Sequence, residues 1–261
     1  MNDSLLSIQG LSVVIRRECG EKRLLEEVDF QVSSDSIVAL VGASGSGKTT
    51  MGLAILRLLP EAMRVSKGKV LWQGQDLLTL SEEAMRRKRG KEIAMIFQEP
   101  LNAFDPVFPV GYQIAEVLQE HTALTAAARQ QRVLELLADV EIEHPERVAR
   151  QYPHQLSGGM RQRAMIAQAI AASPALVIAD EPTSNLDVTI QAKIMELFRK
   201  LRRQRKISML LISHDLGMVK ELADHVVVLA DGRPIESGKV SEVLERPRHP
   251  FTEKILQASL L

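Results

Sequence analysis

The sequence predicts an α/β fold with a parallel sheet, interrupted by a helical insertion. Short apolar runs are typical of strands buried on both faces, and they occur at 37–41, 176–179, 226–229 and, after an initial serine, 208–212. Helical patterns at 188–203 and 215–222 alternate with the later runs, as in parallel sheets. By contrast, residues 99–170 contain loops and helical periodicity but no strand candidate.

The first half of the chain supplies the remaining elements. Residues 5–15 and 24–33 read as strands, with a turn at Gly20-Glu21 between them. A helix is expected from Lys48 to about Leu59, where Pro60 would end it. Further strands are expected at 70–72 and 93–97, a polar helix at 82–89, and insertion helices at 110–121 and 125–139. We therefore expect one domain of 261 residues, with an α/β core at 1–98 and 171–261 and a helical subdomain at 99–170.

Composition excludes several classes of protein. The formal net charge is zero and aromatic residues are 3% of the chain, which disfavours nucleic-acid binding. The single cysteine, Cys19, excludes an internal disulfide framework and fits a reducing compartment. No apolar run approaches the roughly 20 residues that cross a bilayer, and the N-terminus lacks the pattern of a signal peptide. If the chain acts at a membrane, another protein must hold it there.

The first phosphate site is a glycine-rich loop between a buried strand and a helix. Residues 42–49, GASGSGKT, match the pattern G-x-x-x-x-G-K-[ST]. The glycines allow backbone N–H groups to surround phosphates, Lys48 can reach the β and γ phosphates, and the Thr49 hydroxyl can bind Mg²⁺. The expected phosphate-binding residues are Gly42, Ala43, Ser44, Gly45, Ser46, Gly47, Lys48, Thr49 and Thr50.

Polar side chains follow three of the predicted strands. Asp180 can hold the Mg²⁺ shell at the end of 176–179, and Glu181 can deprotonate the attacking water. His214 follows 208–212 and can donate to phosphate oxygens, and Gln98 follows 93–97 and can contact Mg²⁺ or the water. Taken singly, each could be an ordinary polar residue at a strand end.

A second anion site is expected more than 100 residues later. Residues 156–163, LSGGMRQR, open a helix predicted from about Gly159 to Ala172, and Ser157 can cap it. Gly158 and Gly159 leave the backbone accessible at the positive end of the helix dipole.

The order of these motifs resembles the ATP-binding subunit of an ABC transporter. In chain order they are 42–49, Gln98, 156–160, Asp180-Glu181, 184–187 and His214. The resemblance covers the whole chain. It implies a RecA-like P-loop NTPase core with an antiparallel β subdomain, plus a helical subdomain that carries the signature segment 156–160.

The resemblance also implies why one chain has two anion sites. ABC ATPases form head-to-tail dimers, so the signature residues Ser157, Gly158, Gly159 and Met160 would act on ATP held by another subunit, either identical or a paralogue. Asp187 would communicate across that interface, and Gln98 would couple the nucleotide to the helical subdomain. The expected partners are a second ATPase, two membrane permease subunits and, indirectly, an extracytoplasmic binding protein, at the cytoplasmic face of a bacterial inner membrane.

Several sequence segments resemble one group of ABC importers in particular, the peptide/nickel group. These segments are 97–102 with 105–106, 152–155, 178–192 and 248–252. Relatives in this group that import peptides often continue further and carry cysteines there, so the sequence modestly favours nickel or metal chelates over di- and oligopeptides. Many ABC ATPases stack adenine on an aromatic residue of the first strand, where this chain has Ile15. We therefore expect weak selectivity between ATP and GTP.

Two other classes compete with the transporter reading. A soluble ABC ATPase of DNA repair or translation would need a coiled-coil insertion or a second ATPase domain, and neither is visible. The basic runs 86–89 and 199–206 fit solvated helix faces better than nucleic-acid contacts. A P-loop kinase would leave 156–160 and Gln98 unexplained.

Overall fold

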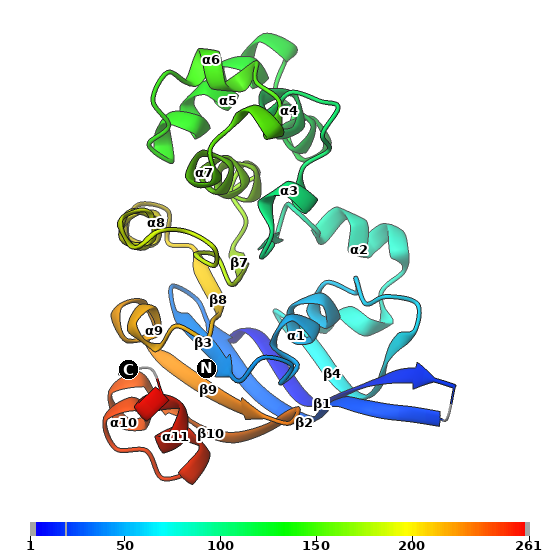
Figure 1. Ribbon diagram of the computed structural model, residues 1–261. Helices are drawn as coiled ribbons and strands as arrows, with labels where there is room; N and C mark the ends of the chain where they lie inside the picture. Colours follow the sequence, from blue (N-terminus) through cyan, green and yellow to red (C-terminus); the bar gives the residue numbers. More distant parts are fainter. Residues whose placement is uncertain (1–3, 19, 259–261) are drawn as a thin grey trace. The chain divides into compact units, whose positions relative to one another are not determined.

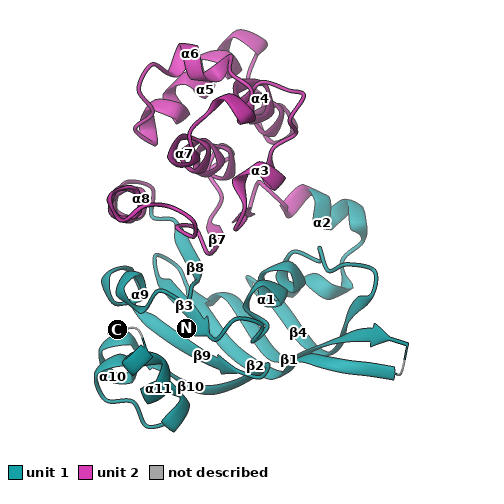
Figure 2. Ribbon diagram, in the orientation of Figure 1, with its two compact units in different colours: residues 1–86, 206–261 teal, residues 87–205 magenta. Residues whose placement is uncertain are grey.

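The computed structural model describes residues 4–18 and 20–258, which form two compact units. Unit 1 consists of residues 1–86 and 206–261, and unit 2 of residues 87–205 (Figure 2). Cys19 lies outside the described residues. The boundaries between the units differ from those expected at 98/99 and 170/171. The strands at 93–96 and 176–180 and the long helix at 188–205 cluster with the insertion helices.

Unit 1 contains an antiparallel sheet in the order β2-β1-β4-β5. Its strands are β1 (Ser4–Arg17), β2 (Gly20–Ser33), β4 (Met63–Trp72) and β5 (Gln75–Asp76). Gly20 begins β2 and pairs with Arg17, so the hairpin strands extend further than the sequence indicates. This is the antiparallel β subdomain that the resemblance implies.

The second sheet of unit 1 is mainly parallel and runs in the order β10-β9-β3-β8. Its strands are β3 (Ile37–Gly42), β8 (Ser208–Ile212), β9 (His225–Ala230) and β10 (Arg233–Lys239). Both β8 and β9 run parallel to β3, and the three lie side by side (Figure 1). Every residue of β3 and β8 is buried, which confirms the interpretation of the apolar runs.

The helices of unit 1 correct one expectation. They are α1 (Lys48–Ile55), η1 (Leu77–Thr79), α9 (Leu216–Leu222), α10 (Val240–Glu245) and α11 (Pro250–Ala258), with the start of α2 (Glu82–Lys88). The helix expected to reach Pro60 ends at Ile55 instead. Arg57 adopts a left-handed φ of 53°, and its guanidinium donates to the carbonyls of Leu77 and Leu80. A tertiary contact therefore ends α1 before proline can.

Unit 2 combines one parallel strand pair with helices. The strands β6 (Ile93–Ile96) and β7 (Leu176–Asp180) are parallel. The helices are α3 (Pro100–Ala103), α4 (Val110–His121), α5 (Ala126–Asp139), α6 (Pro145–Ala149), η2 (Pro153–Gln155), α7 (Gly158–Ala169) and α8 (Val188–Arg205). Helix α7 packs against α3, α4, α5 and β6.

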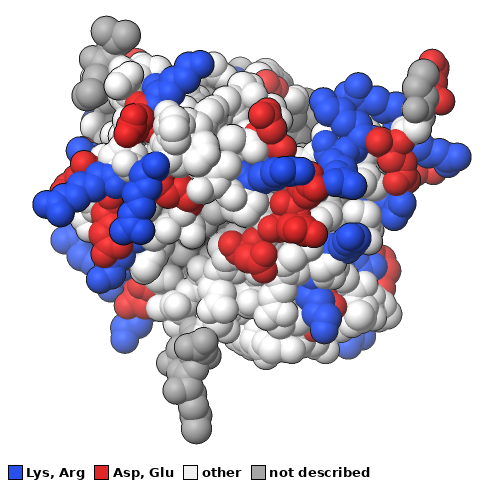
Figure 3. Space-filling view, turned by 90° about the horizontal axis from the view of Figure 1, so that it is seen from below, with Lys and Arg blue, Asp and Glu red and all other residues white. Residues whose placement is uncertain are grey.

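Charges of both signs are interspersed on the surface. Lys and Arg alternate with Asp and Glu over the face in Figure 3. Glu26, for example, pairs with both Arg23 and Arg233, and Arg64 pairs with Glu21 at 2.9 Å. Within the described residues, none of the helices combines the length and apolar character needed to cross a membrane.

Candidate nucleotide-binding and catalytic site

The loop 42–49 has the backbone of a phosphate cradle. Gly45 and Gly47 adopt positive φ angles of 79° and 98°, which glycine tolerates best. Gly47 precedes α1, whose N-terminus has neither an acidic residue in its first turn nor a side-chain cap. Its N–H groups and dipole therefore favour an anion. The Ser46 hydroxyl is buried without a hydrogen-bond partner among the described residues, which also fits a polar ligand.

Lys48 is buried against the same loop. Its ammonium donates to the carbonyls of Gly42 and Ala43 at 2.9 and 3.0 Å. These contacts hold the cation inside the curve of the loop. Thr49 and Thr50 follow at the start of α1, and Ala43, Ser44 and Gly45 lie on the exposed rim. A hydroxyl at Thr49 is an oxygen ligand of the type that Mg²⁺ prefers.

The strand register places His214 level with the beginning of the loop. In the parallel pair β3–β8, Leu40 pairs with Ile212, and the Ser213 N–H donates to the Leu40 carbonyl at 3.2 Å. Two residues further along each strand, Gly42 and His214 leave the same edge of the sheet. His214 is exposed there. Within unit 1 the fold thus brings the predicted histidine to the predicted phosphate loop.

In unit 2, the register of the parallel pair β6–β7 likewise brings the polar residues after the two strands to the same edge. Ile96 pairs with Ala179, so Gln98 and Glu181 follow their strands at the same level. Asp180 is 1% exposed and Glu181 is 9% exposed. Glu181 also adopts a φ of 47°, a conformation that costs a non-glycine residue on the order of 1–3 kcal/mol and is concentrated at functional sites.

The signature segment begins α7 as expected, one residue earlier than predicted. Ser157 is the N-cap, and its hydroxyl accepts a hydrogen bond from the Met160 N–H at 3.3 Å. A Cβ added at Gly158 would meet only Leu186 Cδ2, at 3.8 Å, whereas at Gly159 it would meet Ile190 Cγ2 at 3.0 Å. Of these two glycines, Gly159 is closely packed within unit 2, whereas Gly158 leaves its backbone open there. That openness is what an approaching ligand needs.

Asp187 has a local role that the sequence did not indicate. Its carboxylate accepts a hydrogen bond from the Ile190 N–H at 2.9 Å, which is an N-cap contact for α8. The turn before it is fixed by Gln191, whose amide donates to the carbonyls of Thr183 and Leu186, both at 3.2 Å. The predicted role across an interface stays a prediction.

One cavity joins three of the predicted motifs. A space of about 210 Å³ is lined by Gln98, Glu99, Pro100, Leu101, Gly158, Arg161, Gln162, Ser184, Asn185 and Leu186. Unit 2 therefore brings together the residues after β6, the start of α7 and the turn after β7. Gln162 was missed from the sequence, although its position four residues after Gly158 places both on one face of α7.

Ile15, the residue predicted to lie beside adenine, is part of the antiparallel sheet of unit 1. It is half-buried in β1, between Lys22 and Met63 of the neighbouring strands. Its role beside adenine stays a prediction. No three His, Cys, Asp or Glu side chains cluster as a metal site among the described residues. A Mg²⁺ that takes most of its ligands from phosphates and water is compatible with that finding.

The fold and these residues define a P-loop ATPase with an inserted helical unit. The family model described as "ABC transporter" matches residues 25–184, and the chain belongs to the ABC transporter family as an ABC-type ATPase domain. It is 47% identical over 255 residues to the peptidoglycan transport ATP-binding protein YejF of Agrobacterium fabrum, covering 97% of this chain and 47% of that protein. It is 45% identical over 253 residues to the oligopeptide transport ATP-binding protein OppD of Bacillus subtilis, covering 97% and 71%. The chain thus spans about half the length of the first relative.

Solved structures agree with the fold. A dimeric structure of MJ0796, a bacterial ABC transporter cassette, superposes with a TM-score of 0.81 at 26% identity, covering 90% of this chain and 98% of that one. A second structure of MJ0796, with the same TM-score, is a dimeric post-hydrolysis state bound to ADP and Pi. These comparisons confirm the predicted fold class and family.

Proposed function

We propose that the chain hydrolyses MgATP as half of a head-to-tail dimer and thereby drives uptake through two membrane permease subunits. The proposal rests on two separate anion-binding helix starts. One is the loop 42–49 before α1 in unit 1, and the other is the start of α7 at Gly158 in unit 2. In a head-to-tail dimer, the N-terminus of α1 in one subunit and the N-terminus of α7 in the other would bind the same nucleotide.

The proposed chemistry assigns one role to each group. Backbone N–H groups of 42–49 and Lys48 bind the phosphates. Thr49, Asp180 and Gln98 would hold Mg²⁺, which neutralises phosphate charge when bound. Glu181 takes a proton from the attacking water, and His214 donates to phosphate oxygens. Ser157, Gly158, Gly159 and Met160 contact the nucleotide of the other subunit.

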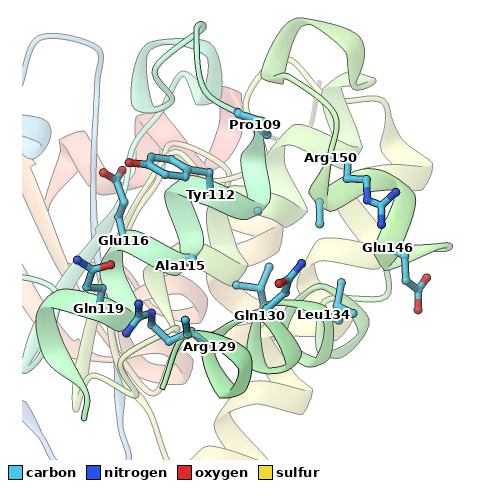
Figure 4. A pocket seen from close by; sticks show the side chains of 14 residues that line it. Pro109, Tyr112, Ala115, Glu116, Gln119, Arg129, Gln130, Leu134, Glu146 and Arg150 are labelled. Atoms are coloured by element: carbon cyan, nitrogen blue, oxygen red, sulfur yellow. The ribbon is translucent and has the colours of Figure 1, made fainter. Parts of the chain in front are cut away.

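The partner surface that we propose for a permease lies on the helices of unit 2. A cavity of about 540 Å³ is lined by α4, α5 and α6. Figure 4 shows Glu116, Gln119 and Arg129 on one side and Glu146 and Arg150 on the other. Ala115 and Leu134 contribute apolar lining between these charges. Charged rims of both signs around apolar lining suit a short amphipathic segment of a partner.

Exposed apolar side chains continue this surface. Val107, Phe108 and Tyr112 are exposed, and the rings of Phe108 and Tyr112 stack with centroids 4.9 Å apart. Large exposed apolar groups that adjoin a cavity mark an interaction site. Because α4 follows the segment after Gln98, a permease bound here would sense the nucleotide through that segment.

We propose di- or oligopeptides as the transported substrates. The two relatives described above are named for peptidoglycan transport and oligopeptide transport. Those names give no support to the preference for nickel that the sequence suggested. Nickel or another metal chelate therefore becomes the alternative outcome of an uptake experiment.

Uptake in a strain that lacks the gene tests this function. We expect loss of labelled oligopeptide uptake with nickel uptake unchanged, and recovery with the wild-type gene but not with Glu181→Gln. Loss of nickel uptake alone would overturn the peptide assignment. Normal uptake of both, without association of the chain with permeases, would favour a soluble ABC ATPase.

A pair of substitutions on α5 tests the permease surface. Ala126 lines the 540 Å³ cavity, whereas its neighbour Ala127 does not, and both are exposed. Ala126→Trp should place an indole ring in the cavity and abolish uptake while the purified chain still hydrolyses ATP. Ala127→Trp is the matched control and should support normal uptake. Equal uptake by the two variants would place the permease elsewhere.

A further inference from the structure

Two buried polar atoms belong to the lining of the 210 Å³ cavity of unit 2, and neither has a hydrogen-bond partner in the part of the chain that the structure describes. Gln162 is 2% exposed, and its Nε2 has no hydrogen-bond partner among the described residues. The Ser184 hydroxyl is also buried and also has no hydrogen-bond partner among the described residues. Both residues line the cavity, Gln162 from α7 and Ser184 from the turn after β7. Burying a polar group without a partner is costly, so two such groups in one cavity point to a polar occupant.

The size and chemistry of the cavity fit water. A water molecule occupies about 30 Å³ of liquid volume and needs two to four polar partners. The Gln162 amide supplies a donor, and the Ser184 hydroxyl can donate or accept. Gln98 and Asn185 add further polar side chains to the lining.

Each of the two residues is connected to a predicted functional group. The Ser184 N–H donates to the carbonyl of Glu181 at 3.1 Å, so the two ends of this tight turn are tied together. Gln162 lies one turn after Gly158 on the same face of α7. A bridge between Gln162 and Ser184 would therefore connect the turn of the proposed base to the signature helix.

We propose that Gln162 and Ser184 are positioning residues that hold ordered water between α7 and the turn after β7. The water bridge fixes the position of the start of α7 relative to Glu181. The proposed base and the signature segment therefore keep a constant relative position. Neither side chain touches the nucleotide. This inference rests on the proposed ATPase function and adds the two residues that coordinate its parts.

Substitution of Gln162 separates this role from simple packing. Gln162→Met keeps the side-chain volume and removes the amide that holds the water, so we expect only a small change in stability to urea. The kcat for ATP hydrolysis should fall at least about fivefold, because a lost bridge of roughly 1 kcal/mol corresponds to that factor. The KM for ATP should stay unchanged. Gln168→Met, on the same helix but outside the cavity lining, is the matched control.

The double variant tests whether the two residues act through one bridge. Ser184→Ala should lower kcat as Gln162→Met does, and the double variant should be no slower than the slower single variant. Multiplied effects, or an unchanged kcat in Gln162→Met, would overturn the proposal. Hydrolysis by the wild type and by Gln168→Met tests the proposed function separately.

A high-resolution crystal structure of the full chain tests the bridge directly. We expect ordered water within about 3 Å of both Gln162 Nε2 and Ser184 Oγ, and its loss in Gln162→Met. A dry cavity in the wild type, or a direct contact of each atom with protein groups, would contradict the inference.

Discussion

Gly47 allows the strongest quantitative test of the phosphate loop. Its φ is 98°, and a Cβ built there would lie 2.6 Å from Leu25 Cδ2 and 2.8 Å from the Leu24 carbonyl oxygen. The backbone conformation costs an alanine about 1–2 kcal/mol, and overpacking adds about 1–3 kcal/mol. We therefore expect Gly47→Ala to lower the free energy of unfolding of unit 1 by about 2–5 kcal/mol.

Gly45 provides the matched control. Its φ is 79°, but a Cβ there would meet none of the described residues within 4 Å. Gly45→Ala should therefore show only the backbone cost of about 1–2 kcal/mol. The difference between the two variants isolates the close approach of β2 to the loop.

Fluorescence of the single tryptophan provides the assay. Trp72 is 1% exposed in β4, so its emission during urea unfolding reports on unit 1. Equal stability losses in Gly45→Ala and Gly47→Ala would refute the reasoning, because the overlap with Leu24 and Leu25 would then carry no cost.

Three further predictions concern other parts of the chain. Glu181→Gln should abolish steady-state phosphate release while fluorescent ATP analogues still bind, and continued turnover would reject Glu181 as the base. Gly158→Ala should fold normally, since the added Cβ would meet only Leu186 among the described residues. Gly158→Asp should keep ATP binding by the single chain but lose hydrolysis. Loss of ATP binding by the single chain would mean that Gly158 has a role other than contact with the nucleotide of the other subunit. Partial burial raises the pKa of Glu236, but hydrogen bonds, including those from the N–H groups of 248–249, outweigh it and lower the pKa below 4.5. A lowered pKa stabilises the fold above that pH, so the stability difference between wild type and Glu236→Gln should shrink as pH falls below 4.5 in urea titrations, and a constant difference would contradict this.

Local sequence patterns were sufficient to predict the buried strands and the N-termini of α1 and α7. The run Ile37–Val41 has no polar residue, and its burial on both faces follows from that composition. The cap at Ser157 is likewise a local interaction, and the structure confirms it. These features depend on residues that are close together in the chain.

Features set by distant contacts could not be read in this way. The edge strand β10 contains Pro234 and Gly238, which weaken a strand signal, and it forms by antiparallel pairing with β9. The early end of α1 depends on carbonyls about twenty residues beyond Arg57. The cavity around Gln162 requires three segments that only the folded unit brings together.

The mass of the Glu181→Gln variant with ATP tests the central claim most directly. A chain of 29.0 kDa that is half of an ATPase should approach twice that mass in light scattering when ATP is present and return to 29.0 kDa with ADP. The further substitution Gly158→Asp should abolish the increase. A mass that stays at 29.0 kDa at saturating ATP would contradict the account.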